Sequence, residues 1–238
     1  MKVLVLTGAG ISAESGIPTF RGDDGLWEGH RFEDVATPQA FQRNPDLVHE
    51  FYNARRRNLL DESIQPNAAH LALAEFEKQH DDAFLLVTQN IDDLHQRAGS
   101  QNVLPMHGEL LKARCSLKGD LFDWRGDLSV RTPHPTDPDL VGTLRPHVVW
   151  FGEIPIGLDR IADFAADCDL FLAIGTSAVV YPAAGIVAAT PPHCRRVEIN
   201  LDNTPQSDQF DLTIRGKASI EVPKFLASLD AEVGKFRS

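Results

Sequence analysis

The first group of residues that could do chemistry is a glycine-rich turn, Thr7-Gly8-Ala9-Gly10-Ile11-Ser12-Ala13, which directly follows the apolar run Val3–Leu6. Gly8, Gly10 and Ala13 have the small size and the spacing that let backbone N–H groups approach a pyrophosphate at the start of a helix. A tight turn from strand to helix also favours glycine, so this turn alone leaves a purely structural role open.

The loop that follows this turn brings an aromatic ring and a cation close to the expected phosphate site. Gly16 and Pro18 stop any helix, and Phe20 and Arg21 come next. Arg21 is suited to contact a phosphate or a ribose, and Phe20 is suited to shield a reactive sugar carbon from water. The alternative is a surface loop anchored by a buried phenylalanine.

A tyrosine and an arginine share one face of an expected helix. Tyr52 and Arg55 are three residues apart within residues 46–60, so their side chains lie on the same side. A phenol beside a guanidinium suits a carboxylate, because one donates a single hydrogen bond and the other a fork of two. Alternatively, Tyr52 only packs and Arg55-Arg56-Arg57 is a solvated run.

Polar residues also follow two expected strands. Gln89 and Asn90 end one strand, where their carboxamides can meet ribose hydroxyls or an amide, and Asp92 follows as either a pocket residue or a helix cap. Gly175-Thr176-Ser177 ends another strand and suits the other half of a nucleotide, although a helix-entry turn has the same composition. His107, one of nine histidines, lies between Met106 and Gly108, and taken alone it favours a structural role.

The elements that must position these residues follow from the apolar pattern. The expected strands are Val3–Leu6, Phe84–Val87, Leu170–Ile174, Arg196–Asn200 and Leu212–Ile214. The expected helices are Asp46–Leu60, Ala68–Gln79, Leu158–Cys168, Ala183–Ala189 and Val222–Leu229. Near-continuous apolar runs suit parallel strands covered on both faces, and their alternation with helices predicts an α/β fold with a doubly wound parallel sheet. The Gly- and Pro-containing residues 112–144 break the pattern, and we expect a small inserted domain there.

The composition of the 238 residues excludes several classes of protein. The formal net charge is -11, which repels phosphate backbones, so we expect no direct binding of nucleic acid. No apolar stretch is long enough to cross a bilayer, and the N-terminus leads straight into the first strand, so we expect no membrane span, secretory signal or regulatory extension there. Three cysteines without a C-x-x-C pair fit a reducing compartment, and we expect a cytoplasmic protein.

Several further motifs occur in a fixed order along the chain. With Gly8 to Arg21, they are Thr88-Gln89-Asn90-Ile91-Asp92-Asp93-Leu94-His95, Met106-His107-Gly108-Glu109-Leu110, Arg145-Pro146-His147-Val148-Val149-Trp150-Phe151-Gly152-Glu153, Gly175-Thr176-Ser177 and Asn200-Leu201-Asp202. This ordered set resembles the sirtuin family of NAD-dependent protein-lysine deacylases. The resemblance covers the chain from Val3 to about Val222, and the set is far more specific than one glycine turn.

The resemblance implies a Rossmann-like large domain, residues 1–28, 68–111 and 145–238, and a small domain made of the insertions 29–67 and 112–144. NAD would bind between the two domains. The cofactor-binding residues that the resemblance implies are Gly8, Ala9, Gly10, Ser12, Phe20, Arg21, Trp27, Gln89, Asn90, Ile91, Asp92, Gly175, Thr176, Ser177, Asn200, Leu201, Asp202 and Ala218. His107 would be the general base, and the peptide substrate would lie against Val149, Phe151, Gly152 and Glu153.

The resemblance also implies a reaction and its substrates. The amide oxygen of an acyl-lysine would attack the nicotinamide ribose, and His107 would deprotonate a ribose hydroxyl, giving nicotinamide, acyl-ADP-ribose and free lysine. Phe51-Tyr52-x-x-Arg55-Arg56 resembles the signature of sirtuins that remove acidic acyl groups, so Tyr52 and Arg55 would bind a succinyl or malonyl carboxylate, and acetyl groups are a further expected substrate.

Other functions stay open beside this one. The partners expected are acyl-lysine proteins, and the oligomeric state is open, with a monomer compatible with the sequence. Mono-ADP-ribosyl transfer or NAD hydrolysis on the same fold is the main alternative. A non-catalytic NAD-sensing module is a further one, and a dehydrogenase fits only the glycine turn.

The chain departs from the family pattern at the expected zinc site. Most sirtuins hold zinc with two cysteine pairs, but here Cys115 has Lys118 where a partner is expected, and the next cysteine is Cys168. We therefore expect a small domain without zinc. Its packing would instead depend on Leu117, Leu121, Phe122, Trp124, Val130 and Leu140.

Overall fold

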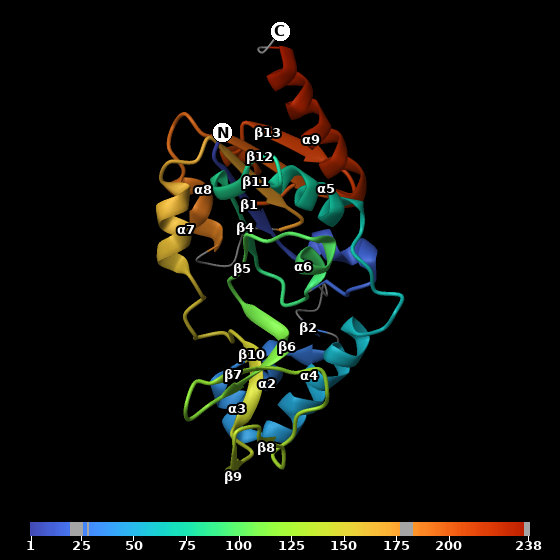
Figure 1. The fold of residues 1–238 in the computed structure, drawn as a ribbon, viewed down its shortest axis with the longest axis vertical. Coiled ribbons are helices and arrows are strands. Elements are labelled where there is room, and N and C mark those ends of the chain that lie inside the picture. Colours follow the sequence, from blue (N-terminus) through green and yellow to red (C-terminus); the bar gives the residue numbers. More distant parts are fainter. Residues whose placement is uncertain (20–25, 28, 177–182, 236–238) are drawn as a thin grey trace.

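The structure, a computed structural model, describes residues 1–19, 26–27, 29–176 and 183–235, and it has two lobes (Figure 1). The expected residues Phe20, Arg21 and Ser177 lie outside the described residues, as does the side chain of Trp27. The upper lobe in Figure 1 is built on one large sheet that carries both termini, and the lower lobe combines short helices with small sheets.

The large lobe contains a six-stranded parallel sheet with the strand order β13-β12-β11-β1-β4-β5. Its strands are β1 (Val3–Thr7), β4 (Phe84–Thr88), β5 (Val103–Pro105), β11 (Leu170–Ile174), β12 (Arg195–Asn200) and β13 (Leu212–Arg215). The central strand β1 pairs with β11 on one side and β4 on the other, with Val3 opposite Leu170 and Phe84. The order reverses beside β1, as in a Rossmann fold, so the doubly wound parallel sheet that the sequence predicts is confirmed.

Helices cover both faces of this sheet. On one face lie α5 (Ala68–Glu77) and α9 (Ala218–Lys235), and on the other lie α7 (Leu158–Ala165) and α8 (Ala183–Ala189). Alternate residues of β1 point to the two faces of the sheet. Val3 and Val5 belong to the first core cluster, which includes α5 and α9, and Leu4 and Leu6 belong to the second, which includes α7 and α8. Helix α9 begins at Ala218 rather than at the expected Val222, and both residues pack into the first cluster.

Short elements complete the turns of the large lobe. The glycine turn after β1 continues into α1 (Ala9–Ser12) and the 3-10 turn η1 (Ala13–Ser15). The others are η2 (Asp81–Ala83), α6 (Leu94–Ala98) and η3 (Ser207–Gln209). All of the strand ends that carry the expected site residues therefore meet at one edge of the sheet, as parallel strands require.

The small lobe consists of two parts of the chain. The first contains β2 (Leu26–Trp27), β3 (His30–Arg31), α2 (Phe32–Val35), α3 (Pro38–Arg43) and α4 (Pro45–Leu59). The second contains β6 (Gly108–Cys115), β7 (Leu121–Asp123), β8 (Pro133–His134), β9 (Asp137–Val141) and β10 (Leu144–Val148). These strands form an antiparallel sheet β10-β6-β7 and a separate β8-β9 pair. The exact domain boundaries stay a prediction; the β6–β10 pairing extends beyond both ends of the expected 112–144 insert.

The two parts of the small lobe are joined through buried polar side chains of α4. The Asn53 side chain donates to Leu128 O at 2.8 Å and accepts from Leu128 N at 2.9 Å. Arg56 is fully buried and donates to Leu110 O at 3.1 Å and to Asn53 Oδ1 at 2.8 Å. The expectation of a solvated arginine run is therefore wrong for Arg56 and right for Arg57, which is exposed and pairs with Asp127.

The core of the second part differs from the one expected. Leu117, Leu121 and Val130 are exposed, because Leu117 lies in the turn after β6, Leu121 points outward from the edge strand β7, and Val130 lies in a loop. The buried cluster consists of Ala113, Cys115, Leu128 and Leu144, with Phe122 and Trp124 packed against it. Apolar packing does fill this part, and of the expected residues Phe122 and Trp124 take part in it.

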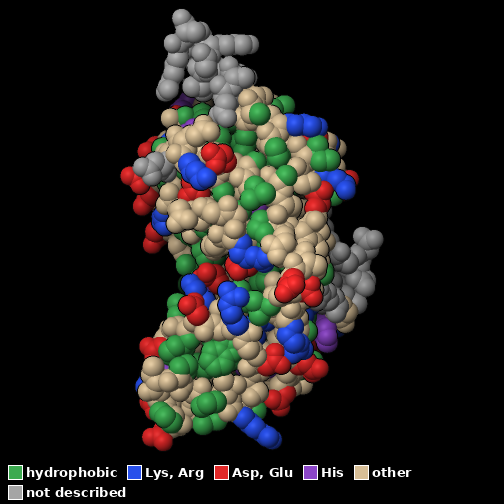
Figure 2. Space-filling view, turned by 45° about the vertical axis from the view of Figure 1, so that its right-hand side comes forward, with side chains coloured by type: hydrophobic (Ala, Val, Ile, Leu, Met, Phe, Trp, Pro, Cys, Tyr) green, Lys and Arg blue, Asp and Glu red, His purple; other side chains and the backbone are tan. Residues whose placement is uncertain are grey.

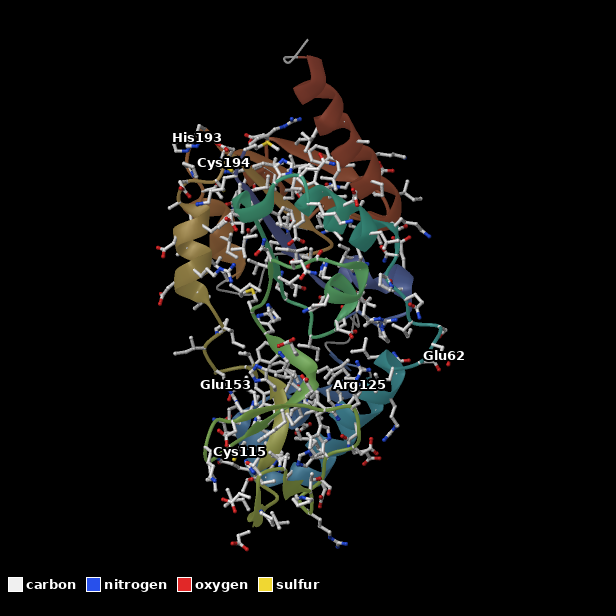
Figure 3. The ribbon with its side chains drawn as sticks, in the orientation of Figure 1. Glu62, Cys115, Arg125, Glu153, His193 and Cys194 are labelled. Carbon is white, nitrogen blue, oxygen red and sulfur yellow. The ribbon has the colours of Figure 1, made fainter. Side chains whose placement is uncertain are left out.

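The cysteines lie far from one another except for one pair. Cys115 is buried in the small lobe, whereas Cys194 lies at the opposite end of the molecule (Figure 3), within 3.4 Å of the Cys168 sulfur. Among the described residues, no group of three or more His, Cys, Asp and Glu side chains is arranged to hold a metal ion. The absence of zinc stays a prediction, which metal analysis of the purified protein tests.

The described residues include no helix that is long and apolar enough to cross a membrane. On the face that Figure 2 shows, basic and acidic side chains lie interspersed near the junction of the two lobes.

Candidate functional site

A cavity of about 990 Å³ lies between the two lobes and contains most of the expected site residues. Those that line it are Gly8, Ala9, Gly10, Ser12, Tyr52, Arg55, Gln89, Asn90, Ile91, Asp92, His107, Val149, Phe151, Gly152, Glu153, Gly175, Thr176, Asn200, Leu201 and Asp202. Ala218 does not line the cavity, because it is buried in the core at the start of α9. Segments that are far apart in the sequence therefore converge on one site.

The glycine turn packs directly against the loop that follows β11. Gly10 N donates to Gly175 O at 2.8 Å, and Gly8 N donates to Ile174 O at 3.0 Å. A Cβ on Gly10 would lie 2.7 Å from Gly175 Cα, and one on Gly8 would lie 2.7 Å from Thr176 Cβ. Glycine at these positions thus permits close contact between the two loops, in addition to any approach to a phosphate.

The floor of the cavity is a hydrogen-bonded set of amide, hydroxyl and carboxyl groups. Asn90 Nδ2 donates to Ser12 Oγ at 3.0 Å, and Ser12 Oγ donates to Asp92 Oδ2 at 3.0 Å. Gln89 Nε2 donates to Thr176 Oγ1 at 2.7 Å, which links the ends of β4 and β11. Burial raises the pKa of Asp92 to about 6, against the effect of its hydrogen bonds from Leu94 and Ser12.

The Asp92 carboxyl group contacts both the first turn of α6 and the wall of the cavity. Its Oδ1 accepts from Leu94 N at 3.1 Å, so the side chain does cap the first turn of α6. Its Oδ2 accepts from Ser12 at the cavity wall. One carboxyl group therefore holds both the first N–H of α6, whose N-cap is Asp93, and a polar residue of the glycine turn.

The imidazole of His107 is held in one tautomer. Its Nδ1 lies 2.9 Å from the carbonyl oxygen of Gln89. A carbonyl only accepts, so Nδ1 carries the proton and Nε2 is the basic nitrogen. Burial lowers the pKa of His107 below its ordinary value, and the hydrogen bond to Gln89 offsets part of this effect. The side chain is therefore a neutral base at pH 7, with a geometry suited to accepting a proton from a bound hydroxyl.

Tyr52 and Arg55 both line the cavity from α4, as their spacing predicts. The Tyr52 phenol is fully buried, and its oxygen accepts a hydrogen bond from Trp150 Nε1 at 3.0 Å. The Arg55 guanidinium lies 3.2 Å from the centre of the Phe51 ring and donates to Phe51 O at 2.8 Å. A phenol and a cation are thus held at the same wall by packing against aromatic rings.

The segment after β10 forms the neighbouring part of this wall. Glu153 accepts from Arg145 at 2.7 and 2.9 Å and from Trp150 N at 2.8 Å. The Glu153 carboxylate therefore fixes the segment after β10 through contacts within the protein. Phe151 N donates to Ala36 O at 3.0 Å, which attaches the segment to α2. Trp150 is a cavity residue that the sequence did not single out, although it lies within one of the motifs.

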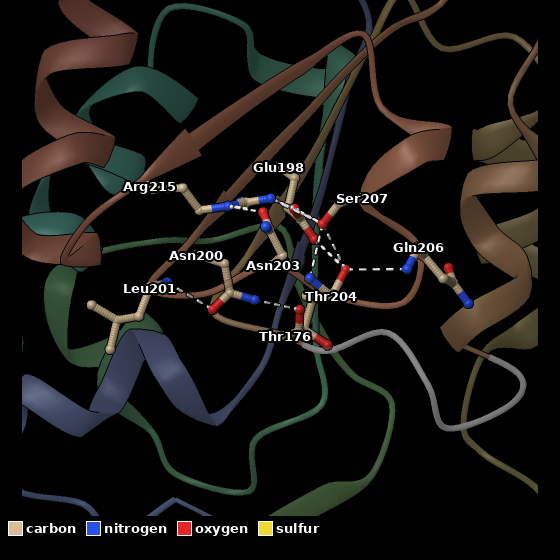
Figure 4. A network of polar contacts seen from close by, with 9 residues as sticks. All are labelled: Thr176, Glu198, Asn200, Leu201, Asn203, Thr204, Gln206, Ser207 and Arg215. Atoms are coloured by element: carbon tan, nitrogen blue, oxygen red, sulfur yellow. Dashed lines mark hydrogen bonds and ion pairs between the residues drawn. The ribbon is translucent and has the colours of Figure 1, made fainter.

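At the other end of the cavity, a buried carboxylate fixes the loop after β12 (Figure 4). Glu198 accepts from Thr204 Oγ1 at 2.6 Å, Ser207 Oγ at 2.7 Å and Arg215 Nη2 at 2.6 Å. Asn200 Nδ2 donates to Thr176 O at 2.9 Å, so the same strand also holds the end of β11. This loop carries Leu201 and Asp202 to the cavity wall.

The described residues of this cavity fit a dinucleotide. Its volume is at the upper end of the range of about 300–1,000 Å³ that small-molecule sites have. Small residues line the end of β1, amides and hydroxyls line its floor, and the cavity lies at the carboxyl edge of a sheet whose strand order reverses there.

Comparisons with known proteins agree with this geometry. The Sir2 family model matches residues 8–182. A Rhodopirellula baltica protein named NAD-dependent protein deacylase is 68% identical, covering 97% of this chain and all of the relative, and one from Salmonella typhi is 56% identical over 94% of this chain and 82% of the relative. A crystal structure of a Sir2 homologue in complex with NAD is 40% identical with a TM-score of 0.85, covering 97% of this chain and 90% of that one. The chain therefore belongs to the Sir2 family.

Proposed function

We propose that this enzyme removes succinyl and malonyl groups from lysine side chains of proteins, and acetyl groups as well, in an NAD-dependent reaction. The chain is an NAD-dependent protein deacylase, the activity by which its curated relatives are named, so the proposal concerns the acyl group. We expect it to act in the cytoplasm, without a nucleic acid or membrane partner. The observation that carries the acyl preference is the placement of Tyr52 and Arg55 in the wall of the cavity that His107 also lines.

The Tyr52–Arg55 pair supplies what an acidic acyl chain needs and an acetyl group lacks. A succinyl or malonyl group ends in a carboxylate, which accepts hydrogen bonds and attracts a cation. The Arg55 guanidinium provides the charge, and its aromatic support by Phe51 limits the side-chain freedom lost on binding. The wall is otherwise rich in apolar and aromatic groups such as Leu59 and Phe151, so a carboxylate is bound most favourably at this pair.

The remaining residues divide the reaction between them. Bound NAD supplies an electrophilic sugar carbon, and the acyl-lysine supplies the nucleophilic amide oxygen. His107 Nε2 accepts the proton of a ribose hydroxyl, with Gln89 O fixing the orientation of the ring. We assign the strand ends of the large lobe to NAD and residues 149–153 to the substrate peptide. A Sir2 protein that is 31% identical, with a TM-score of 0.75, binds a myristoylated histone peptide, which supports an acylated peptide as the class of substrate.

The test is steady-state kinetics with peptides that differ only in the acyl group. In Arg55→Met we expect kcat/KM for succinyl-lysine to fall by about 10- to 100-fold, because a hydrogen bond to a charged group contributes about 1.5–3 kcal/mol. The value for acetyl-lysine should stay within about twofold of wild type, since that substrate has no carboxylate. Nicotinamide release is the measurement in each case.

Arg57→Met is the matched control, because Arg57 lies on the same helix but is exposed and pairs with Asp127. It should leave both activities unchanged. An equal loss of succinyl and acetyl activity in Arg55→Met would exclude the selectivity proposal. Nicotinamide release that needs no acyl peptide would favour ADP-ribosyl transfer or NAD hydrolysis instead.

A further inference from the structure

We propose that Trp150 is a positioning residue for acyl selectivity. It orients the Tyr52 phenol so that the phenol O–H donates a hydrogen bond to the carboxylate of an acidic acyl group. This role rests on the acidic-acyl function proposed above. It adds a residue outside the Tyr-x-x-Arg motif, from a different part of the chain, to the group that decides which acyl chain is removed.

The direction of one hydrogen bond is the central observation. Trp150 Nε1 lies 3.0 Å from Tyr52 Oη, and the two residues are 2% and 0% exposed. An indole N–H is only a donor, so the phenol oxygen is the acceptor in this pair. Because the phenol oxygen accepts from Trp150, its O–H is directed away from the indole, and a bound carboxylate, which only accepts, complements a donor with that direction.

Trp150 is itself fixed from two sides. The Arg145 guanidinium stacks on its ring, with the guanidinium carbon 3.3 Å from the ring centre. Glu153 binds Arg145 through both carboxylate oxygens and also accepts from Trp150 N at 2.8 Å. Both the ring and the backbone of Trp150 are thus held by one ion pair, and Glu153 lies at the junction of the two lobes in Figure 3. The indole N–H cannot turn away from Tyr52 without breaking these contacts.

The consequence differs between substrates. A succinyl carboxylate gains a hydrogen bond from an oriented phenol, whereas an acetyl methyl group gains nothing from it. Loss of the indole donor therefore changes the ratio of the two activities, while a merely structural loss would lower both. Burial also raises the pKa of Tyr52, which keeps the phenol protonated and able to donate.

The first experiment measures kcat/KM for succinyl- and acetyl-lysine peptides in wild type, Trp150→Phe and Trp124→Phe. Trp150→Phe removes the N–H and keeps an aromatic ring under Arg145. We expect the succinyl-to-acetyl ratio to fall by about two- to tenfold, the range for one neutral hydrogen bond. Trp124→Phe is the matched control, because its indole donates to Asp127 O at 3.4 Å and lies outside the cavity. It should leave the ratio unchanged.

The double variant decides whether Trp150 acts through the phenol. In the Tyr52→Phe background, Trp150→Phe should lower the ratio no further, because no phenol remains to orient. A further drop of the same size in that background would overturn the proposal. An unchanged ratio in the single variant Trp150→Phe would overturn it as well. If wild type itself shows no activity on succinyl-lysine, the proposed function fails; if wild type has it and Trp150→Phe keeps its ratio, only the role of Trp150 fails.

A second measurement avoids dependence on the folding of Trp150→Phe. Nitrogen-15 labelling of the three tryptophans gives indole N–H signals, of which Trp124→Phe removes one. Tyr52→Phe should move one of the other signals upfield, as loss of a hydrogen bond requires. Addition of succinyl-lysine peptide with NAD to wild type should move the same signal more than acetyl-lysine peptide does. Indole signals that move neither in Tyr52→Phe nor on addition of succinyl-lysine peptide with NAD would overturn the proposal.

Discussion

The two walls of the cavity are built on different principles. The wall from the large lobe consists of strand ends and turns, Gly8–Ser12, Gln89–Asp92 and Gly175–Thr176, held together by hydrogen bonds between neighbouring loops. The wall from the small lobe consists of aromatic and cationic side chains, chiefly Tyr52, Arg55 and Trp150, and the hydrogen-bonded residues Tyr52 and Trp150 are 98 residues apart in the sequence.

This difference indicates a division of labour. The large-lobe wall follows from topology, because parallel strands end at one edge and leave small and polar groups there for a dinucleotide. The small-lobe wall follows from contacts between α4 and the segment after β10, and it holds the pair of residues to which we assign the acyl carboxylate. Changes to the first wall should therefore affect all acyl substrates alike, and changes to the second, such as Arg55→Met and Trp150→Phe above, should affect their ratio.

The largest expected effect comes from His107, which lies where the two walls meet. His107→Ala removes the residue that we propose as the general base, so we expect kcat/KM to fall by about 10²- to 10⁴-fold for every acyl group. Thermal unfolding should show that the protein still folds. His193→Ala, at an exposed histidine, is the control. Full activity in His107→Ala would refute the catalytic role. A loss confined to one acyl group would contradict the claim that only the small-lobe wall determines the ratio of the acyl activities.

The pH profile of wild type sharpens the assignment to His107. Only the neutral imidazole accepts a proton, so activity should rise with pH through the pKa of His107 and then level. Because burial lowers this pKa, the acidic limb should lie below pH 6.5. The acidic limb should be the same for succinyl and acetyl peptides, since it reports the protonation of His107, which acts on all acyl groups alike.

A smaller effect is expected from crowding the large-lobe wall. Gly10→Ala places a Cβ 2.7 Å from Gly175 Cα, so the two loops must separate. Overpacking of this kind costs about 1–3 kcal/mol, and we expect the KM for NAD to rise by about tenfold or more, equally with both acyl peptides. The control is Gly126→Ala, where no atom lies within 4 Å of the added carbon. A change in the acyl ratio of Gly10→Ala would contradict the division between the walls.

The large-lobe wall could be predicted from the sequence because its signals are local. The strand Leu170–Ile174 was expected with the same bounds that the structure shows, since a short apolar run between turns is typical of a covered parallel strand. The residues after such strands then share one edge whatever the rest of the fold does. This accounts for the convergence of Gln89, Thr176 and Asn200 on one cavity.

The small lobe could not be predicted in the same way. Strand β9 carries Asp137, Pro138 and Asp139, and its burial does not alternate regularly, so no periodic signal marks it. Arg56 has the same charge as its neighbours in the sequence, and its burial depends on acceptors that no local pattern indicates, the carbonyls of Leu110 and Gly126 and the side chain of Asn53. The hydrogen bond from Trp150 to Tyr52 depends on the packing of α4 against the segment after β10, which no local pattern indicates.

The smallest expected effect tests whether the large-lobe wall extends to the loop after β12. Glu198→Gln keeps the shape of the side chain but removes the charge that holds Thr204, Ser207 and Arg215 (Figure 4). We expect the KM for NAD to rise by about two- to fivefold, because the charge contributes an extra part of about 0.5–1 kcal/mol to these hydrogen bonds. The kcat and the KM for the peptide should not change.

Glu75→Gln is the matched control for Glu198→Gln, since the pair of Glu75 with Lys78 is exposed and lies on α5. A rise in the KM for the acyl peptide, rather than for NAD, would show that the Glu198 network does not support the large-lobe wall. A rise for NAD alone, equal with both peptides, means that a buried ion pair behind the loop supports cofactor binding without touching the cavity. The Arg145–Glu153 pair would then have its counterpart at the opposite end, one ion pair positioning each wall.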